Sequence, residues 1–559
     1  MCGIVGYVGR RPCRDLLVAG LERLEYRGYD SAGVSVIEDD RVESVRAVGN
    51  LANLRAAIEE RGVNGGGVAV AAPPVTTGVA HTRWATHGRV TEENAHPHSD
   101  SSGRVHIVLN GIVENHAKLR RRLEAAGQQF SSETDAEVVA HLIASLYDGD
   151  LAEAVRAAFG ELRGHYAFVV MHADHPGLLV GARKECPLVA GIGAEESFLA
   201  SAIPAFLSET RRTVTIENGE IVSIDASGVR ITDAAGEPVE RQPEEIDWDE
   251  AAAEKGGYET FMLKEIHEQA DAVAETIAGR LPGDEGVDLS ELELDDDFLR
   301  GLRRIVIVAC GTSYHAGLVG RYAIEEWARV PVEMDIASEY RYRNPVVGPE
   351  DLVIGITQSG ETADTLAAMR LAREQGARVL AITNIRGSQA TRDADSVLYT
   401  RAGLEIGVAA TKTFVAQVAS MYLIGLWLAE LRETLPRERL AELTAELKRL
   451  PSRIDATLEA CEEGVREVAA KTAQRDFFLY LGRHIGLPVC LEGALKLKEI
   501  SYIPTDAYAA GEMKHGPIAL LDESTPVVCV ATESPVLDKV LSNVEEVRAR
   551  GAETIAIAT

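Results

Sequence analysis

The sequence predicts an α+β N-terminal domain followed by two α/β units, each built on a parallel sheet. Residues 1–240 contain many short apolar runs broken by Gly, Asn and Ser, with few helical patterns between them. From residue 258 onward, strand patterns alternate with helical patterns, and the alternation restarts near residue 477. Alternating strands and helices are typical of parallel sheets, whereas many strands with few helices favour sheets between helical layers.

A chain of 559 residues is too long for one hydrophobic core. The polar, acidic segment 241–257 ends in two glycines, so we expect it to be a linker. The predicted domains therefore cover residues 1–240, 258–435 and 436–559.

The individual elements follow from the hydrophobic patterns. An apolar stretch over 414–429 is too short to span a bilayer, so we expect a buried core or interface helix there, inside a helical region near 411–470. Strands are predicted over 105–109, 166–170, 220–224, 304–309, 351–356, 379–383, 477–481, 526–531 and 554–558, and helices near 14–24, 115–126, 134–146 and 484–498.

Composition limits the class of protein. The formal net charge of −30 argues against a nucleic-acid partner. Seven scattered cysteines form no CxxC pair, and His96-Pro97-His98 is interpreted as a loop, so we expect no metal and no cofactor. The chain does not start with a basic region followed by an apolar one, and a cytoplasmic protein without a membrane partner is expected.

Cys2 follows the initiator methionine. Removal of that methionine would leave a residue that carries both a thiol and a free α-amine. Since an α-amine titrates near neutrality, it can serve as the base for its own side chain. Taken alone, an early cysteine fits a small buried hydrophobic residue equally well.

Three further fragments suit chemistry at a cysteine. Asn110-Gly111 follows a predicted strand, and a side-chain amide beside a backbone N–H can stabilise an oxyanion. Arg83 suits bidentate binding of a carboxylate, and Asp135, before a helix, offers a carboxylate to an ammonium group. Each fragment alone also fits a turn, an exposed arginine or a helix cap.

Together these fragments resemble the N-terminal-nucleophile glutamine amidotransferase domain, whose fold has four αββα layers. A Gly, Ala, Val and Pro stretch over 63–78 is longer than the resemblance leads us to expect, which indicates a loop insertion. The matching motifs, in order, are CGIVGYVG (2–9), LEYRGYDSAG (24–33), HTRWATHG (81–88), NAHPH (94–98), NGIVENH (110–116) and SETDAEV (132–138).

The resemblance implies a role for each matching residue. Cys2 would be the nucleophile, its α-amine the base, and Asn110 and Gly111 the oxyanion hole. Arg83 would bind the α-carboxylate of glutamine and Asp135 its α-ammonium, while Trp84 would gate the passage of ammonia. The implied glutamine-binding residues are Arg83, Trp84, Thr86, His87 and Asp135.

Two hydroxyl-rich loops follow neighbouring predicted strands, one at Thr312-Ser313 and one over 357–362. At the start of a helix, backbone N–H groups and hydroxyls favour phosphate binding. One such loop alone fits a helix cap, but two on adjacent strands favour a phosphosugar site.

The second half resembles the sugar isomerase domains of the glutamine–fructose-6-phosphate aminotransferase family, also called glucosamine-6-phosphate synthases. The two resemblances cover nearly the whole chain. The matching motifs are ACGTSYHAG (309–317), ASEYRYR (337–343), QSGETADTL (358–366), EIGVAATKTF (405–414), LEGALKLKEISYI (491–503) and AYAAGEMKHGPIAL (507–520).

This resemblance also implies site residues. Glu499 would move a proton between C1 and C2 of the sugar with Lys496 in support, and His515 would open the ring from a neighbouring subunit. A carboxylate beside a lysine suits such proton transfer. Thr357 stands where a serine is expected. The implied sugar-phosphate residues are Thr312, Ser313, Thr357, Gln358, Ser359, Thr362 and Val408.

The implied activity is conversion of fructose 6-phosphate and glutamine to glucosamine 6-phosphate and glutamate, the first step of amino-sugar (UDP-N-acetylglucosamine) synthesis, by a homodimer. The family also carries a C-terminal tail with an imine-forming lysine, which residues 1–559 do not include, so we expect glutamine hydrolysis with little synthesis.

Alternative functions stay open on the sequence alone. They are a phosphoribosyl-transferring amidotransferase, although no acidic pyrophosphate-binding loop follows a strand here, another glutamine-dependent sugar-phosphate amidotransferase, a sugar-phosphate deglycase, and a phosphosugar-binding glutaminase or regulatory protein without synthase activity.

Eleven lysines in a chain with 87 acidic residues suggest adaptation to salt. If so, the melting temperature should rise steeply between low and molar KCl, because salt screens the repulsion between surface carboxylates. A melting temperature that stays flat or falls, followed by circular dichroism across that range, would reject the interpretation in favour of an ordinary acidic protein.

Overall fold

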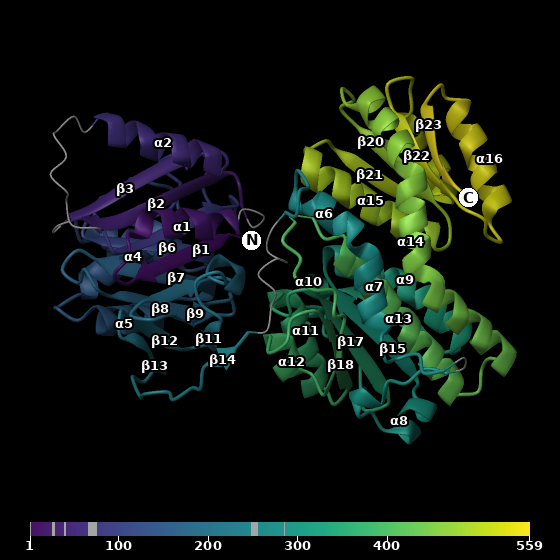
Figure 1. Cartoon of the computed structure of the whole chain (residues 1–559), viewed down its shortest axis with the longest axis horizontal. Coiled ribbons are helices and arrows are strands. Elements are labelled where there is room, and N and C mark those ends of the chain that lie inside the picture. Colours follow the sequence, from purple (N-terminus) through teal and green to yellow (C-terminus); the bar gives the residue numbers. More distant parts are fainter. Residues whose placement is uncertain are drawn as a thin grey trace. The chain divides into compact units, whose positions relative to one another are not determined.

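The computed structural model describes residues 2–24, 28–38, 41–64, 75–246, 255–283, 286–407 and 409–559. The chain forms two compact units, Met1–Glu254 and Lys255–Thr559. In Figure 1 the first unit is coloured purple to blue and the second teal to yellow.

The first unit contains two antiparallel sheets. The larger has the strand order β14-β11-β9-β10-β1-β4-β2-β3, and the smaller has the order β13-β12-β8-β7-β6-β5. The strands of the larger sheet are β1 (Gly3–Val8), β2 (Ser31–Glu38), β3 (Arg41–Val48), β4 (Thr77–Arg83), β9 (Val189–Ile192), β10 (Ser197–Ala200), β11 (Arg212–Thr215) and β14 (Glu244–Glu245). Those of the smaller sheet are β5 (His98–Ser99), β6 (Val105–Val113), β7 (Gly164–His172), β8 (Leu179–Lys184), β12 (Ile221–Asp225) and β13 (Gly228–Thr232).

The two sheets stack face to face between helices. On β6, Val108 packs in the core between the sheets, with Ile4 of β1, whereas Ile107 and Leu109 pack in the core beneath the helices. This alternation reflects the two-residue period of a strand. The helices are α1 (Cys13–Glu22) and α2 (Leu51–Asn64) over the larger sheet, and α4 (Asp135–Leu146) and α5 (Leu151–Glu161) over the smaller, with α3 (His116–Ala125) beside α4. The four layers expected for an αββα fold are therefore present.

The second unit begins with a parallel sheet in the order β16-β15-β17-β18-β19. Ile305 and Ile307 of β15 pack in one core cluster and Val306 and Val308 in another, so the strand is apolar throughout because both of its faces are covered. The strands are β15 (Arg304–Ala309), β16 (Val332–Ile336), β17 (Asp351–Thr357), β18 (Arg378–Thr383) and β19 (Ser396–Tyr399).

Helices cover this sheet on both faces (Figure 1). The helix α13 is the one described helix long and apolar enough to cross a membrane, but 61% of its apolar window is buried within the protein, as expected for a core helix. The helices are α6 (Phe261–His267), α7 (Gln269–Ile277), α8 (Asp296–Gly301), α9 (Gly311–Trp327), α10 (Ala337–Tyr340), α11 (Ala363–Glu374), α12 (Gln389–Asp393), α13 (Lys412–Leu431) and α14 (Arg437–Thr472).

A second, smaller parallel sheet follows, with the order β21-β20-β22-β23. Its elements are β20 (Phe478–Gly482), α15 (Gly486–Ser501), β21 (Thr505–Ala509), the short helices η5 (Ala510–His515) and η6 (Pro517–Leu520), β22 (Pro526–Ala531), α16 (Leu537–Arg548) and β23 (Glu553–Ala558).

All the predicted strands and helices are present, with small shifts at their ends. Two details of the prediction are wrong. β6 does not end before Asn110-Gly111 but continues to Val113, because β7 pairs with it along its whole length. His98 lies in the short strand β5 rather than in a loop. The predicted helical region near 411–470 is present and consists of two helices, α13 and α14, with a turn over 432–436 between them. Of the segment 63–78, residues 65–74 lie outside the described residues.

Candidate active sites

Cys2 directly precedes β1, and it is in contact with the residue that follows β4 and with a residue of β6. The Trp84 N–H donates to the Cys2 sulfur at 3.2 Å, and the Asn110 Nδ2 donates to the Cys2 carbonyl oxygen at 2.9 Å. The next residue must be small, because a Cβ on Gly3 would lie 2.6 Å from the Thr82 hydroxyl. The structure thus brings the predicted Cys2, Trp84 and Asn110 together.

Burial raises the pKa of the Cys2 thiol, although the Trp84 N–H and the charge of Arg83 oppose this effect. A buried thiol with a raised pKa stays protonated near neutral pH. A reaction at this sulfur therefore needs a base close by.

Gly111 can only be glycine. Its φ is +90°, and a Cβ there would lie 2.0 Å from the His165 carbonyl oxygen and 2.8 Å from the Cys186 sulfur. The left-handed backbone inside the paired strand β6 explains why an Asn-Gly sequence, usually a turn, stands there.

Arg83 and Asp135 are both buried, at 3% and 4% exposure. The Arg83 guanidinium donates to the carbonyl oxygens of His87, Gly88 (2.9 Å) and Arg89 (3.1 Å), so it holds the loop that follows β4. Asp135, the first residue of α4, accepts the Val113 N–H at 2.7 Å. Burial lowers the pKa of Arg83, while the charges of Cys2, Asp30 and Asp135 raise it, which is consistent with acidic groups close to the guanidinium.

The remaining predicted glutamine-binding residues lie around this loop. The Trp84 ring meets Tyr29 edge-on, with centroids 5.3 Å apart, and the His87 ring meets His116 edge-on at 4.4 Å. Thr86 is exposed.

In the second unit, α9 and α15 are joined by a polar cluster. The Thr312 hydroxyl donates to Glu492 at 2.9 Å and accepts from Lys496 Nζ at 3.0 Å. Lys496 also forms an ion pair with Glu499 at 2.6 Å, and His315 Nδ1 lies 2.7 Å from Glu492. Thr312, Lys496 and Glu499 were predicted and lie together here.

Glu492 and His315 were missed. Glu492 is only 6% exposed, and a buried carboxylate needs partners, which Thr312, His315 and Lys496 supply. A sequence signal exists, because positions 492, 496 and 499 fall on one face of a helix at a spacing of four and then three residues.

The second predicted loop leaves β17, which lies next to β15 in the sheet. The hydroxyls of Thr357 and Thr362 are 2.8 Å apart, and the Ser359 hydroxyl accepts the Glu361 N–H at 3.2 Å. Gly360 has a φ of +67°, and a Cβ there would lie 1.9 Å from the Ser388 hydroxyl. Since parallel strands end at the same edge, this loop and the Thr312 loop share one edge of the sheet.

Other predicted sugar-site residues are less constrained. Ser313 is buried, and the Gln358 carbonyl accepts the Asn384 N–H at 3.1 Å. His515 is exposed at the end of η5, and within the described part of the chain no hydrogen bond or ion pair joins it to the Lys496 cluster. Val408 lies outside the described residues.

Two buried carboxylates hold the segment on either side of position 408. Glu265 accepts N–H groups of Ile406 and Gly407, the latter at 3.0 Å. Glu405 accepts N–H groups of Thr411 (2.9 Å) and Thr413 (3.1 Å). Burial, together with the charge of Glu405, raises the pKa of Glu265 to about 7.

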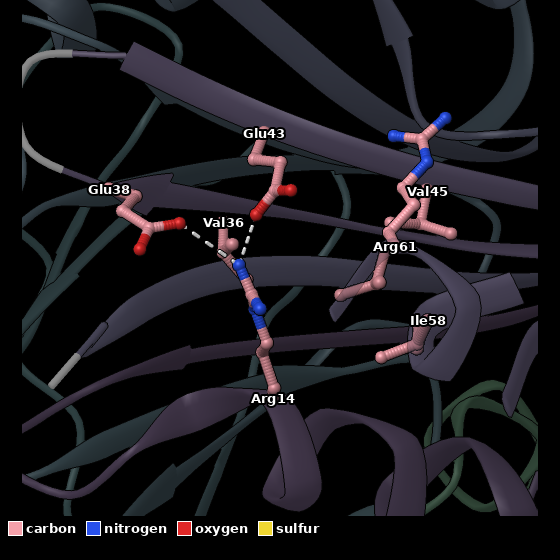
Figure 2. Close-up of a pocket in the computed structure, with 8 residues that line it drawn as sticks. Arg14, Val36, Glu38, Glu43, Val45, Ile58 and Arg61 are labelled. Atoms are coloured by element: carbon pink, nitrogen blue, oxygen red, sulfur yellow. Dashed lines mark hydrogen bonds and ion pairs between the residues drawn. The ribbon is translucent and has the colours of Figure 1, made fainter. Parts of the chain in front are cut away.

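A pocket elsewhere in the first unit carries no predicted residue. Figure 2 shows Arg14 paired with Glu38 at 3.1 Å and with Glu43. These three side chains are about 40% exposed, so the pairs are surface ion pairs of little energetic weight. Aliphatic side chains and Arg61 of α2 complete the lining. Within the described ranges, no group of three or more His, Cys, Asp or Glu side chains could hold a metal ion.

Comparisons with known proteins agree with this organisation. The family model for a glutamine amidotransferase domain matches residues 41–233, and the SIS domain model matches residues 298–426 and 475–559. The protein is thus an amidotransferase domain followed by two SIS segments.

Relatives over the full length define the family. The chain is 48% identical to the glutamine–fructose-6-phosphate aminotransferase [isomerizing] of Streptomyces coelicolor and 51% identical to that of Mycolicibacterium smegmatis, over 100% of this chain and 90% of each relative. The C-terminal domain of glucosamine-fructose-6-phosphate aminotransferase from Francisella tularensis matches with a TM-score of 0.53 and 41% identity, covering 55% of this chain and 85% of that one. The chain belongs to the isomerizing glutamine–fructose-6-phosphate aminotransferase family.

The buried Glu265 predicts a pH-dependent stability. Its folded pKa of about 7 lies above the ordinary value of 4.5, so the folded protein keeps a proton that the unfolded chain has lost. The contribution of Glu265 to the free energy of unfolding therefore falls by about 2–3 kcal/mol between pH 5 and pH 8. The free energy of unfolding would be measured in urea for wild type and for Glu265→Gln at each pH. The difference between the two proteins should change by this amount, and a difference that stays constant with pH would contradict the prediction.

Proposed function

We propose that the protein carries out the reaction of its family, transfer of the amide nitrogen of glutamine to fructose 6-phosphate to give glucosamine 6-phosphate and glutamate, and not only the glutamine hydrolysis with little synthesis expected above for residues 1–559. The observation that carries the proposal is the arrangement at Cys2, where the Asn110 amide donates to the Cys2 carbonyl oxygen at 2.9 Å and the Trp84 N–H donates to the Cys2 sulfur at 3.2 Å. Family membership supplies the substrates.

The first half-reaction is nucleophilic. After removal of Met1, the α-amine of Cys2 takes the thiol proton, and the sulfur attacks the side-chain carbonyl of glutamine. Asn110 Nδ2–H and the Gly111 N–H stabilise the oxyanion. The intermediate collapses to a thioester as the protonated amine returns its proton to the departing ammonia, and water then releases glutamate.

The glutamine backbone is held by charges. Arg83 keeps N–H groups beyond those given to the loop carbonyls, and these bind the α-carboxylate. Asp135 accepts one N–H from Val113, and its other oxygen binds the α-ammonium. Trp84, Thr86 and His87 cover the substrate, with Trp84 controlling the release of ammonia.

The second half-reaction takes place at the sugar. Ammonia adds to C2 of the open-chain ketose and water is lost, which gives an imine. Glu499, held by Lys496 at 2.6 Å, removes a proton from C1 and returns it to C2, and the proton of the C1 hydroxyl passes to the imine nitrogen, so that C1 becomes the aldehyde and C2 carries the amine. His515 of a neighbouring copy opens the ring. The phosphate and nearby hydroxyls are bound by Thr312, Ser313, Thr357, Gln358, Ser359, Thr362 and the backbone of Val408.

We also propose that the protein is a cytoplasmic homodimer that binds neither nucleic acid nor a membrane. Its net charge of −30 disfavours polyanions such as nucleic acid, and the exposed His515 fits a site completed by a second copy.

Cys2→Ala should abolish glutamine hydrolysis, lowering kcat by at least about 10³-fold, because the nucleophile is lost. Binding of fructose 6-phosphate should be unchanged, since the sugar site belongs to the other unit. A glutaminase assay and calorimetric titration with the sugar phosphate measure the two.

Cys13→Ala is the matched control for that experiment, because Cys13 is a cysteine of the same unit that is buried in the apolar core under α1. It should keep its hydrolytic activity. Hydrolysis retained by Cys2→Ala would refute the proposed nucleophile.

A further inference from the structure

Three histidines form a buried cluster beside the Cys2 site. His81, His96 and His98 are 1%, 6% and 1% exposed. The rings of His81 and His96 are stacked with centroids 4.1 Å apart, and His98 meets His96 edge-on at 4.6 Å. The resemblance to known amidotransferases assigned no role to this cluster.

The hydrogen bonds of His81 define its tautomer. Its Nε2 lies 3.0 Å from Asn110 Oδ1 and 3.1 Å from the Leu109 carbonyl oxygen. Both partners are oxygens that can only accept, so Nε2 carries the proton and donates to both. Its Nδ1 is buried and, among the described residues, has no hydrogen-bond partner.

His81 is neutral under working conditions. Burial lowers its pKa to about 3, and the charge of Arg83 acts in the same direction. A proton on Nδ1 would also stand without an acceptor in the core. The Nε2–H donor is therefore present at every pH at which the protein is folded and active.

The Asn110 amide is fixed at both ends. Its Oδ1 accepts from His81, and its Nδ2 donates to the Cys2 carbonyl oxygen at 2.9 Å. A half-turn of the amide would set N–H against the His81 N–H and oxygen against the Cys2 carbonyl. Two favourable bonds would become two repulsive contacts.

We infer that His81 is a positioning residue for glutamine hydrolysis, whose Nε2–H fixes the Asn110 amide so that its N–H groups face Cys2 and the oxyanion. The inference rests on the proposed role of Asn110 as an oxyanion donor. Without His81 the amide can rotate and present its oxygen to the oxyanion, which removes one donor. Loss of such a donor costs roughly 10²–10³-fold in kcat.

The test is a double-mutant cycle on glutamine hydrolysis by the full chain. His81→Phe keeps a ring to stack on His96 but has no N–H donor, and we expect it to lower kcat by about 10–100-fold with KM for glutamine within about threefold. His81→Gln restores a donor at a similar reach and should stay within about fivefold of wild type.

The cycle distinguishes an effect of His81 through Asn110 from a general disturbance of the structure. In an Asn110→Ala background, His81→Phe should lower kcat by less than about threefold further, because the group that it positions is gone. Losses that multiply fully would overturn the inference, as would His81→Phe with wild-type kcat. If His81→Phe does not fold, His81→Leu, which also has no N–H donor, takes its place in the same cycle.

His106→Leu is the control for a lost buried histidine. His106 lies on β6 like Asn110, is 6% exposed, and has its Nδ1 3.1 Å from the Ser35 hydroxyl. The substitution His106→Leu should lower the melting temperature while kcat stays within about twofold of wild type. A kcat loss equal to that of His81→Phe would mean that loss of any buried histidine of this unit lowers activity, and it would overturn the inference. If wild type hydrolyses no glutamine, the proposed function and this inference both fail. If wild type is active but the kcat losses of His81→Phe and Asn110→Ala multiply, only the inference fails.

Discussion

The hydrogen bond from Asn110 to the Cys2 carbonyl oxygen is the interaction on which the first unit's chemistry depends. It joins Cys2, the residue directly before β1 of the larger sheet, to β6 in the smaller sheet. The apolar core between the sheets, with Ile4 on one side and Val108 on the other, sets the distance across which this bond forms. Changes in that packing would therefore alter the nucleophile and its oxyanion donor together.

The second unit depends on a buried polar cluster around Glu492. Glu492 is a buried carboxylate whose partners come from α9 as well as from its own helix, so it ties the two parallel-sheet domains together. Leaving such a group without its partners would be strongly unfavourable. The same cluster holds Lys496 against Glu499. The position of the proposed proton-transfer carboxylate therefore depends on how α9 packs on α15.

The sequence predicted the fold well because its signals are local. An apolar run such as 304–309 predicts a strand without any knowledge of tertiary contacts. The site was predicted less completely, since its geometry depends on which residues face each other across sheets. His81 has no local signature of function, and Glu492 has only its helical spacing from Lys496 and Glu499, so their roles follow from strand register and helix packing. Asn110-Gly111 suggests a turn locally, but pairing with β7 keeps it in a strand.

The central claim, that Cys2 is the nucleophile, can be tested most directly by covalent labelling. The protein would be treated with a glutamine analogue that carries an electrophilic carbon in place of the side-chain amide, and its seven cysteines would be mapped by mass spectrometry. We expect a single adduct, on Cys2 of a peptide that lacks Met1, and protection by excess glutamine. An adduct on Cys186 or another cysteine, or no adduct at all, would contradict the account.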